Sequence, residues 1–287
     1  MPNHECKEDR SRCGILYVVA TPIGNLQDIT QRAIQTLQSV DRIVAEDTRH
    51  SGILIHKLGI KKPIISLHVH NEHEKSASIV QEILSGFSYA LISDAGTPLI
   101  SDPGFKLVTT AKKSNIRVIP IPGACALITA LSAAGVPCDK FIFSGFLAAK
   151  RPMRCTQLQL LCSKGLTVVI YEATHRIQAC VEDISAVYGP TYNFTIAKEL
   201  TKVHECFLSG TASEIQHWLQ EKSVHTQGEF VVLLPPLITT ENFDLTKAKQ
   251  LLDILIKELP LSKAVKIAAK LSTIPKNILY SLAVELK

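Results

Sequence analysis

Short runs of β-branched and other apolar residues alternate with longer amphipathic stretches along the first half of this chain, and this alternation limits its possible folds more than any other feature. The apolar runs predict strands at residues 15–20, 42–45, 63–67, 89–93 and 116–120, and the stretches predict helices at 30–40, 51–58, 74–85, 104–114 and 123–134. Alternation at this spacing indicates a parallel sheet with helices on its faces. The strand runs are apolar without a polar side, which fits strands buried on both faces.

A stretch rich in glycine, proline and cations follows the apolar run 141–143 and interrupts both periodicities over residues 144–154. We place a domain boundary there, which gives an N-terminal α/β domain at 14–144 and a second α/β domain at 145–236. The second domain is expected to contain strands at 166–171, 193–199, 205–208 and 229–234 and helices at 175–188 and 213–221. Two strands joined across residues 200–204 predict a hairpin and hence a mixed sheet.

A small helical extension is predicted at residues 237–287, with helices at 245–257, 262–271 and 275–286. The spacing between the last two helices is typical of helix-turn-helix pairs. The part of the chain from Leu259 onward holds five lysines and one glutamate. Two interpretations fit this pattern: a basic surface for nucleic acid, or a plain helical cap on the second domain.

Composition excludes several classes of protein. The formal net charge of +5 is too small for a polyanion-coating tail. Eight cysteines without a C-x-x-C pair indicate free thiols in a reducing cytoplasm. Residues 1–13 are charged and lack the apolar core of a signal peptide, so we expect a flexible tail. Residues 118–138 carry no charge, but their prolines and glycines leave only about a dozen positions for a helix, so no membrane span is expected.

Three loops of glycine, proline and small residues, at 21–25, 94–98 and 122–126, follow predicted parallel strands. In open α/β sheets the ligand crevice lies at the carboxyl ends of such strands. The loops contain no lysine or arginine, and the chain has neither a P-loop nor a G-x-G-x-x-G fingerprint. We therefore expect a ligand without phosphate groups, adenosine-like or zwitterionic, held by main-chain amides and carbonyls. The alternative is that these residues serve only to form turns.

Charged residues at other strand ends permit both functional and structural interpretations. Glu46 and Asp47 point in opposite directions on an extended segment, so one of them, with Arg49, could face the crevice. Asp47 could equally cap the next helix, with Arg49 in a surface ion pair. His68 and His70 share a face, but no third ligand has a reinforcing spacing, so we predict no metal site.

Five stretches of the sequence form a recognisable set: 20–26 (ATPIGNL), 45–49 (AEDTR), 93–104 (SDAGTPLISDPG), 128–135 (ITALSAAG) and 198–202 (KELTK). With them, residues 14–234 resemble the tetrapyrrole methylase superfamily, and within it the bacterial enzymes that methylate the ribose 2′-hydroxyl of a cytidine in 16S ribosomal RNA of the small subunit. The helical tail resembles the C-terminal extension of that subfamily.

The resemblance implies S-adenosylmethionine as cofactor, bound in a cleft between two α/β domains, together with a homodimer, a cytoplasmic location and 16S rRNA as partner. Matched onto this sequence, the residues expected around the cofactor are Pro22, Asp94, Gly96, Thr97, Ser101, Gly123, Ala124, Cys125, Ala126, Tyr171, Glu172, Gly228 and Glu229.

Methyl transfer to a hydroxyl also requires that a proton be removed. We assign Asp47 or Glu199 as the proton acceptor. Lys202, the other expected catalytic residue, is expected to hold an adjacent phosphate together with Arg49 and Arg176. The expected substrate-binding residues are Arg49, Asn71, Arg176, Lys150 and Arg151, with a solvated linker as the alternative for the last two. Two other functions remain open: a C-methyltransferase acting on a tetrapyrrole, and a nucleic-acid-binding protein without enzymatic activity.

Overall fold

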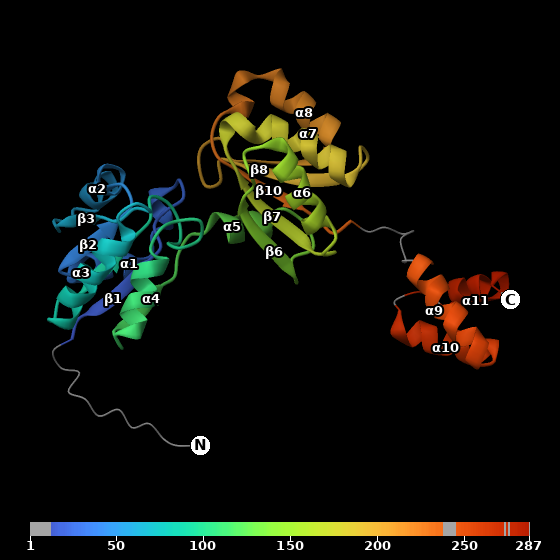
Figure 1. Cartoon of the computed structure of the whole chain (residues 1–287). Coiled ribbons are helices and arrows are strands. Elements are labelled where there is room, and N and C mark those ends of the chain that lie inside the picture. The colour runs from blue at the N-terminus through green and yellow to red at the C-terminus, as the bar shows by residue number, and fades with distance from the viewer. Residues whose placement is uncertain (1–12, 238–244, 273, 275, 287) are drawn as a thin grey trace, which may run out of the picture. The chain divides into compact units, whose positions relative to one another are not determined.

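The computed structural model of this chain describes residues 13–237, 245–272, 274 and 276–286. Of the predicted tail only Cys13 is among these residues, and Cys6 is not. The other seven cysteines are free thiols. The chain divides into two compact units between Pro236 and Leu237, at the predicted start of the helical extension (Figure 1).

A parallel five-stranded sheet forms the N-terminal part of the first unit, as the alternation predicted. Its strand order is β3-β2-β4-β1-β5. The strands are β1 (Ile15–Val19), β2 (Arg42–Ala45), β3 (Ile64–Ser66), β4 (Tyr89–Leu91) and β5 (Arg117–Ile121). The connecting helices are α1 (Gln31–Ser39), α2 (Thr48–Lys57), α3 (Glu72–Leu84) and α4 (Phe105–Lys113), with a 3-10 turn, η2, at Leu26–Asp28.

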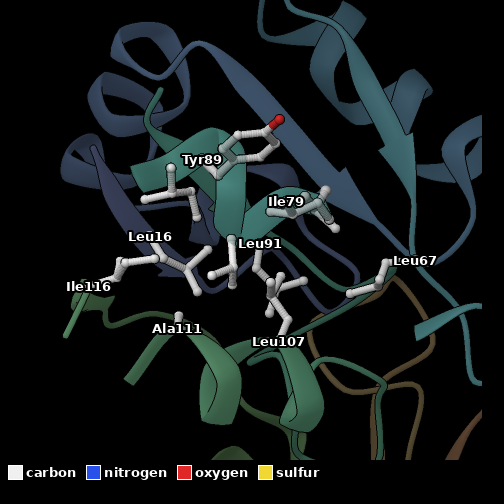
Figure 2. Close-up of a cluster of buried hydrophobic side chains, with 11 residues drawn as sticks. Leu16, Leu67, Ile79, Tyr89, Leu91, Leu107, Ala111 and Ile116 are labelled. Atoms are coloured by element: carbon white, nitrogen blue, oxygen red, sulfur yellow. The ribbon is translucent and has the colours of Figure 1, made fainter. Parts of the chain in front are cut away.

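This first sheet is buried on both faces. Leu91 belongs to one apolar cluster, while its neighbours Ala90 and Ile92 belong to another, because successive side chains of a strand point to opposite sides. Figure 2 shows the first cluster, in which Leu16 and Leu91 of the sheet face Leu107 of α4. Burial on two sides explains why these strands read as continuous apolar runs in the sequence.

The second sheet is mixed, with the order β6-β7-β10-β8-β9. Only the β6–β7 pair is parallel; β8 and β9 form the predicted hairpin. Its strands are β6 (Phe141–Phe146), β7 (Thr167–Glu172), β8 (Asn193–Lys198), β9 (Cys206–Thr211) and β10 (Phe230–Leu234). Its helices are α6 (Arg151–Cys162), α7 (Ile177–Tyr188) and α8 (Ala212–Glu221), with 3-10 turns η3 (Thr174–Arg176) and η4 (Ser223–Thr226).

Strand β6 crosses the predicted domain boundary at 144/145, so the second sheet begins before that boundary. Gly145 has φ +62° and lies at a register shift in the β6–β7 pairing, and a glycine at such an irregularity lets a strand continue rather than end. The predicted break over 144–154 also contains the start of α6, which was not predicted. Pro152 lies in the first turn of this helix, where its lack of an N–H group costs no hydrogen bond.

Helix α5 (Ala126–Ala133) follows the first sheet in the chain but packs on the second. Its buried residues Leu127 and Leu131 join a cluster with Val169 of β7 and Leu233 of β10. This apolar contact fixes the loops after the first sheet against the second sheet.

The C-terminal unit contains the three predicted helices, α9 (Leu245–Glu258), α10 (Leu261–Leu271) and α11 (Lys276–Glu285). Leu252, Ala268 and Leu279, one from each helix, are fully buried in a core of its own. Within the described ranges, no helix combines the length and apolarity needed to cross a membrane.

Arg154 and Asp183 form a buried ion pair inside the second domain, with a nitrogen–oxygen distance of 2.6 Å and side-chain exposures of 5% and 1%. We expect Asp183→Ala to lower the free energy of unfolding by about 3–5 kcal/mol, because it leaves the Arg154 guanidinium buried without a counter-charge. Chemical denaturation measures this loss. Glu182→Ala, at the exposed neighbouring position, is the control, and an equal effect of both variants would contradict the prediction.

Candidate functional site

The loops that follow β4, β1 and β5 lie side by side because these strands are neighbours in the first sheet. The amide of Thr21 donates to the carbonyl of Gly96 at 2.9 Å, and the amide of Gly96 donates back to the carbonyl of Thr21 at 3.1 Å. The hydroxyl of Thr97 donates to the carbonyl of Ala124 at 3.0 Å. The three predicted loops therefore form one connected structure.

Helix α3 holds the far end of the 92–104 loop. The backbone amides of Gly104 and Lys106 both donate to Oε1 of Glu72, at 2.9 and 2.8 Å. Amides in the first turn of a helix have no partners within that helix, so Glu72 caps α4 from its neighbour. Gly104 has φ +124° and no room for a Cβ, which would lie 2.7 Å from a methyl carbon of Leu91.

A cavity of about 400 Å³ lies between these loops and the second sheet. The amide of Leu127 at the start of α5 donates to the hydroxyl of Tyr171 at 3.0 Å and so ties the two walls together. Most of the residues expected around the cofactor line this cavity: Gly96, Thr97, Ser101, Cys125, Ala126, Tyr171, Glu172, Gly228 and Glu229.

The other four expected cofactor residues do not line this cavity. Pro22 and Asp94 line an adjoining cleft instead. Gly123 packs against β1, where a Cβ would lie 2.9 Å from the Cβ of Ala20, and Ala124 contributes the carbonyl that binds Thr97.

Two further lining residues, Ile23 and Ala95, lie in the loops 21–25 and 94–98 that were predicted to hold the ligand. Sequence reasoning missed the rest of the lining: Ile100, Asp102, Phe146, Ala173, Thr174, His175, Leu200, Phe230 and Val231. Two signals could have found some of them. Ile100 and Asp102 lie inside the matched stretch 93–104, and Thr174 and His175 lie at the junction of the predicted strand 166–171 and the predicted helix that begins at 175.

Asp102 has a carboxyl pKa raised to about 7. Burial is the largest cause, and repulsion from Glu46 and Asp94 adds to it, while a hydrogen bond from Ser93 opposes the rise. The pKa of Glu46 is raised too, first by burial and then by Asp94. Acidic groups from the ends of β2 and β4 thus gather beside the cavity, where they favour a cationic ligand.

Glu199 and Lys202 come together at the β8–β9 hairpin. Nζ of Lys202 lies 2.8 Å from Oε1 of Glu199 and 2.9 Å from Oε2 of Glu229. Burial raises the pKa of Glu199, but hydrogen bonds from Lys202 and from the amide of Glu229 outweigh it, so the pKa is lowered overall. Gly228 has φ +95°, and a Cβ there would lie 2.4 Å from Oε1 of Glu199, so this cluster requires glycine.

Asp47 caps the next helix and forms a surface ion pair with Arg49, which are the two structural alternatives stated for these residues. The Asp47 carboxylate accepts the amide of Arg49 at 2.8 Å and caps α2. The guanidinium of Arg49, 91% exposed, forms an ion pair with it at 3.2 Å. The side-chain hydrogen bond from Arg49 is the main reason that the pKa of Asp47 is lowered. Asp47 lines neither the cavity nor the adjoining cleft.

Arg176, which was expected to bind a phosphate, instead binds groups of the second domain. Its Nε lies 3.1 Å from Oε1 of the buried Glu172, and Nη2 donates to the carbonyl of Leu147 at 2.6 Å. Its side chain is only 19% exposed, because these partners lie inside the domain. A phosphate contact by Arg176 would have to compete with both interactions.

The remaining predicted substrate residues lie away from the cavity wall. Asn71 accepts the amide of His68 at 2.9 Å and shapes the connection from β3 to α3. Lys150 is exposed at the start of α6, and Arg151 donates to Asp183 at 2.8 Å. Among the described residues there is no group of three or more side chains suited to hold a metal ion.

A model of the family Tetrapyrrole (Corrin/Porphyrin) Methylases matches residues 15–216, more than half of the chain. The chain belongs to the tetrapyrrole methylase family. A second model, named RsmI C-terminal HTH domain, matches residues 244–287, which include α9, α10 and α11.

Curated members of the family match this chain over nearly its whole length, and each carries the name ribosomal RNA small subunit methyltransferase I. The protein of Haemophilus influenzae is 49% identical, covering 93% of this chain and 95% of that protein. The protein of Pasteurella multocida is 46% identical, with 95% and 97% covered. The protein of Escherichia coli O157:H7 is 44% identical, with 99% of each chain covered.

Solved structures share the fold of this tetrapyrrole methylase at low sequence identity. A diphthine synthase superposes with a TM-score of 0.62 at 14% identity, covering 77% of this chain and 90% of that one. The uroporphyrin-III-C-methyltransferase of Thermus thermophilus gives a TM-score of 0.54 at 16% identity, covering 78% and 96%. This likeness supports the predicted arrangement of two α/β domains.

S-adenosylmethionine is the cofactor of this methylase family. It carries a sulfonium cation and no phosphate, and the cavity fits such a group on two counts. The lining contains no lysine or arginine, and it includes the carboxyl group of Asp102. A volume of about 400 Å³ lies within the usual range of small-ligand sites.

The raised pKa of Asp102 predicts a pH-dependent cost in stability. As the pH rises from about 4 to about 7, the unfolded chain has already lost this proton while the folded chain still binds it, so the free energy of unfolding falls. Asp102→Asn cannot ionise. We expect the difference in free energy of unfolding between variant and wild type to shift by about 1–2 kcal/mol in favour of the variant from pH 5 to pH 8. This value is reduced because Asp102 is partly exposed to water. Denaturation at both pH values measures this, and a pH-independent difference would contradict it.

Proposed function

We propose that this chain is an S-adenosylmethionine-dependent methyltransferase that modifies the ribose 2′-hydroxyl of a cytidine in 16S rRNA of the small ribosomal subunit. One observation carries the proposal: the cavity beside the joined loops has no lysine or arginine in its lining to bind a phosphate group, and it contains the carboxyl group of Asp102. The curated relatives, 44–49% identical over nearly the full chain, support RNA rather than a tetrapyrrole as substrate.

Transfer of a methyl group from a sulfonium is an in-line displacement, in which alignment of the reacting atoms accounts for most of the acceleration. When bound, the cofactor supplies the methyl group and a neutral thioether leaving group. The residues of this chain have to hold the hydroxyl in line, exclude water and accept one proton. The backbone hydrogen bonds between Thr21 and Gly96 and the contact of Leu127 with Tyr171 give the walls the rigidity that alignment needs.

Glu199 is the better supported of the two candidate proton acceptors. Glu199 itself lines neither space, but its ion-pair partner Lys202 lines the cleft, and Glu229, whose amide donates to Oε1 of Glu199 at 3.0 Å, lines both the cavity and the cleft. Lys202 keeps Glu199 ionised and oriented. Asp47 is the second candidate, although its carboxylate already caps a helix.

The C-terminal helices are proposed to contact RNA. Lys263, Lys266 and Lys270 are exposed at spacings of three and four residues on α10, so they share one face of that helix. A helix face with three cations suits a phosphate backbone. We also propose a homodimer and a cytoplasmic location, as the family resemblance and the ribosomal substrate imply.

Two measurements test the proposed function. Calorimetry with S-adenosylmethionine should detect binding to the purified protein, and mass mapping of 16S rRNA from cells lacking the protein should show one ribose methyl group missing. Incubation of those small subunits with protein and cofactor should restore the methyl group. Absence of cofactor binding, or transfer to a porphyrinoid precursor instead of the subunit, would overturn the proposal.

We expect Glu199→Gln to reduce turnover by about a hundredfold or more, the usual contribution of a positioned base, and to preserve cofactor affinity. Asp47→Ala should show this loss instead if Asp47 is the base. Single-turnover methylation of small subunits measures the rate, and calorimetry measures the affinity. Wild-type rates in both variants would contradict both assignments.

Removal of residues 245–287 should weaken binding to small subunits and leave cofactor affinity unchanged. The remaining unit has its own core and contains the whole cavity lining, so it is expected to fold. Filter binding to subunits and calorimetry with the cofactor measure the two affinities. Unchanged subunit affinity would show that the extension is only a helical cap.

A further inference from the structure

A second cleft of about 330 Å³ adjoins the cavity, and it contains residues to which neither the comparisons nor the sequence patterns assign a role. Ile23, Ala95 and Glu229 line both spaces, so the cleft and the cavity adjoin at these three residues. An acceptor in the second cleft would thus lie next to a donor in the first. In-line transfer requires the acceptor to be an immediate neighbour of the donor.

Helix α2 contributes four residues to this cleft: His50, Ile53, Leu54 and Lys57. Their spacing of three, one and three residues places them on a single face of the helix. The opposite side of α2 is the one that packs in the core, through the buried residues Ser51 and Ile55. The core therefore uses only one face of this helix.

The cleft face of α2 combines apolar and cationic groups in a definite order. Ile53 is 58% exposed and lies between His50 and Lys57, which are exposed and have no ion-pair partner among the described residues. The span from His50 to Lys57 is about 10 Å along the helix axis. Pro22 and Leu26 line the cleft as well, and Leu26 is itself 39% exposed.

The third cation of the cleft is already neutralised. Lys202 binds the carboxylates of Glu199 and Glu229 at 2.8 and 2.9 Å, and Asp94 adds another carboxylate to the lining. The basic side chains of the cleft without an ion-pair partner among the described residues are therefore those of Lys57 and His50 on α2. A matching ligand would place an apolar surface on Ile53 and an anionic group near each of His50 and Lys57. A single nucleotide turned out of an RNA strand has this chemistry, with a base and a ribose between two phosphates.

We propose that this second cleft binds the acceptor nucleotide of the RNA and that the His50–Lys57 face of α2 is its recognition surface. The proposal rests on the proposed function and deepens it. Lys57 and His50 contact the phosphates that flank the nucleotide, and Ile53 packs against its base or ribose. The 2′-hydroxyl then points toward the cavity, past the shared lining residue Glu229 and its partner Glu199.

Three variants of the full-length protein test this proposal: Lys57→Ala, His50→Ala and Ile53→Asp. Small ribosomal subunits from cells lacking the protein are the substrate, and S-adenosylmethionine is the donor. We expect each variant to raise the KM for subunits about fivefold or more and to leave the calorimetric affinity for the cofactor within about twofold. Lys57→Ala should also reduce the salt dependence of subunit binding by about one phosphate contact.

Matched controls separate a specific effect from a general loss of charge or of apolar surface. Lys112→Ala removes an exposed cation from α4, and Leu160→Ala removes an exposed apolar side chain from α6; both should behave as the wild type. A wild-type KM and salt dependence in the α2 variants would overturn the proposal while the proposed function stands. Failure of the wild-type protein to methylate subunits would overturn both.

Discussion

The packing of α5 on the second sheet is the interaction on which the rest of the site depends. α5 follows the first sheet in the chain, yet Leu127 and Leu131 are buried with Val169 and Leu233 of the second. Each buried leucine contributes about 1.5–3 kcal/mol, so this contact is stronger than the exposed ion pairs of the surface. The walls of the cavity come from opposite sides of this junction. Apolar packing therefore holds the two walls of the cavity against each other.

The sequence predicts the first sheet well, because strands that are buried on both faces are continuous runs of apolar residues. It fails at the start of the second domain for local reasons. Gly145 accommodates an irregular strand pairing, and Pro152 occupies the first turn of a helix, whereas both residues usually mark breaks. The residues around Gly145 and Pro152 do not indicate that β6 pairs with β7.

The positions of the loops follow from strand order and from the family motifs, but the partners of individual side chains do not. The sequence predicts a phosphate contact for Arg176, and only the fold shows that Glu172 and the carbonyl of Leu147 bind its guanidinium. Asp102 is an ordinary aspartate in the sequence. Its pKa is raised first by burial and then by the carboxylates of Glu46 and Asp94, which the ends of β2 and β4 bring near it.

The contact of Glu72 with α4 has a further consequence for communication within the first domain. The carboxylate at the start of α3 holds the end of the loop that shapes the cavity, through two short hydrogen bonds. Any displacement of the start of α3 must break these bonds or carry that loop with it. By thermodynamic reciprocity, a molecule that pushes on the β3–α3 connection and one that fills the cavity would each alter the affinity for the other.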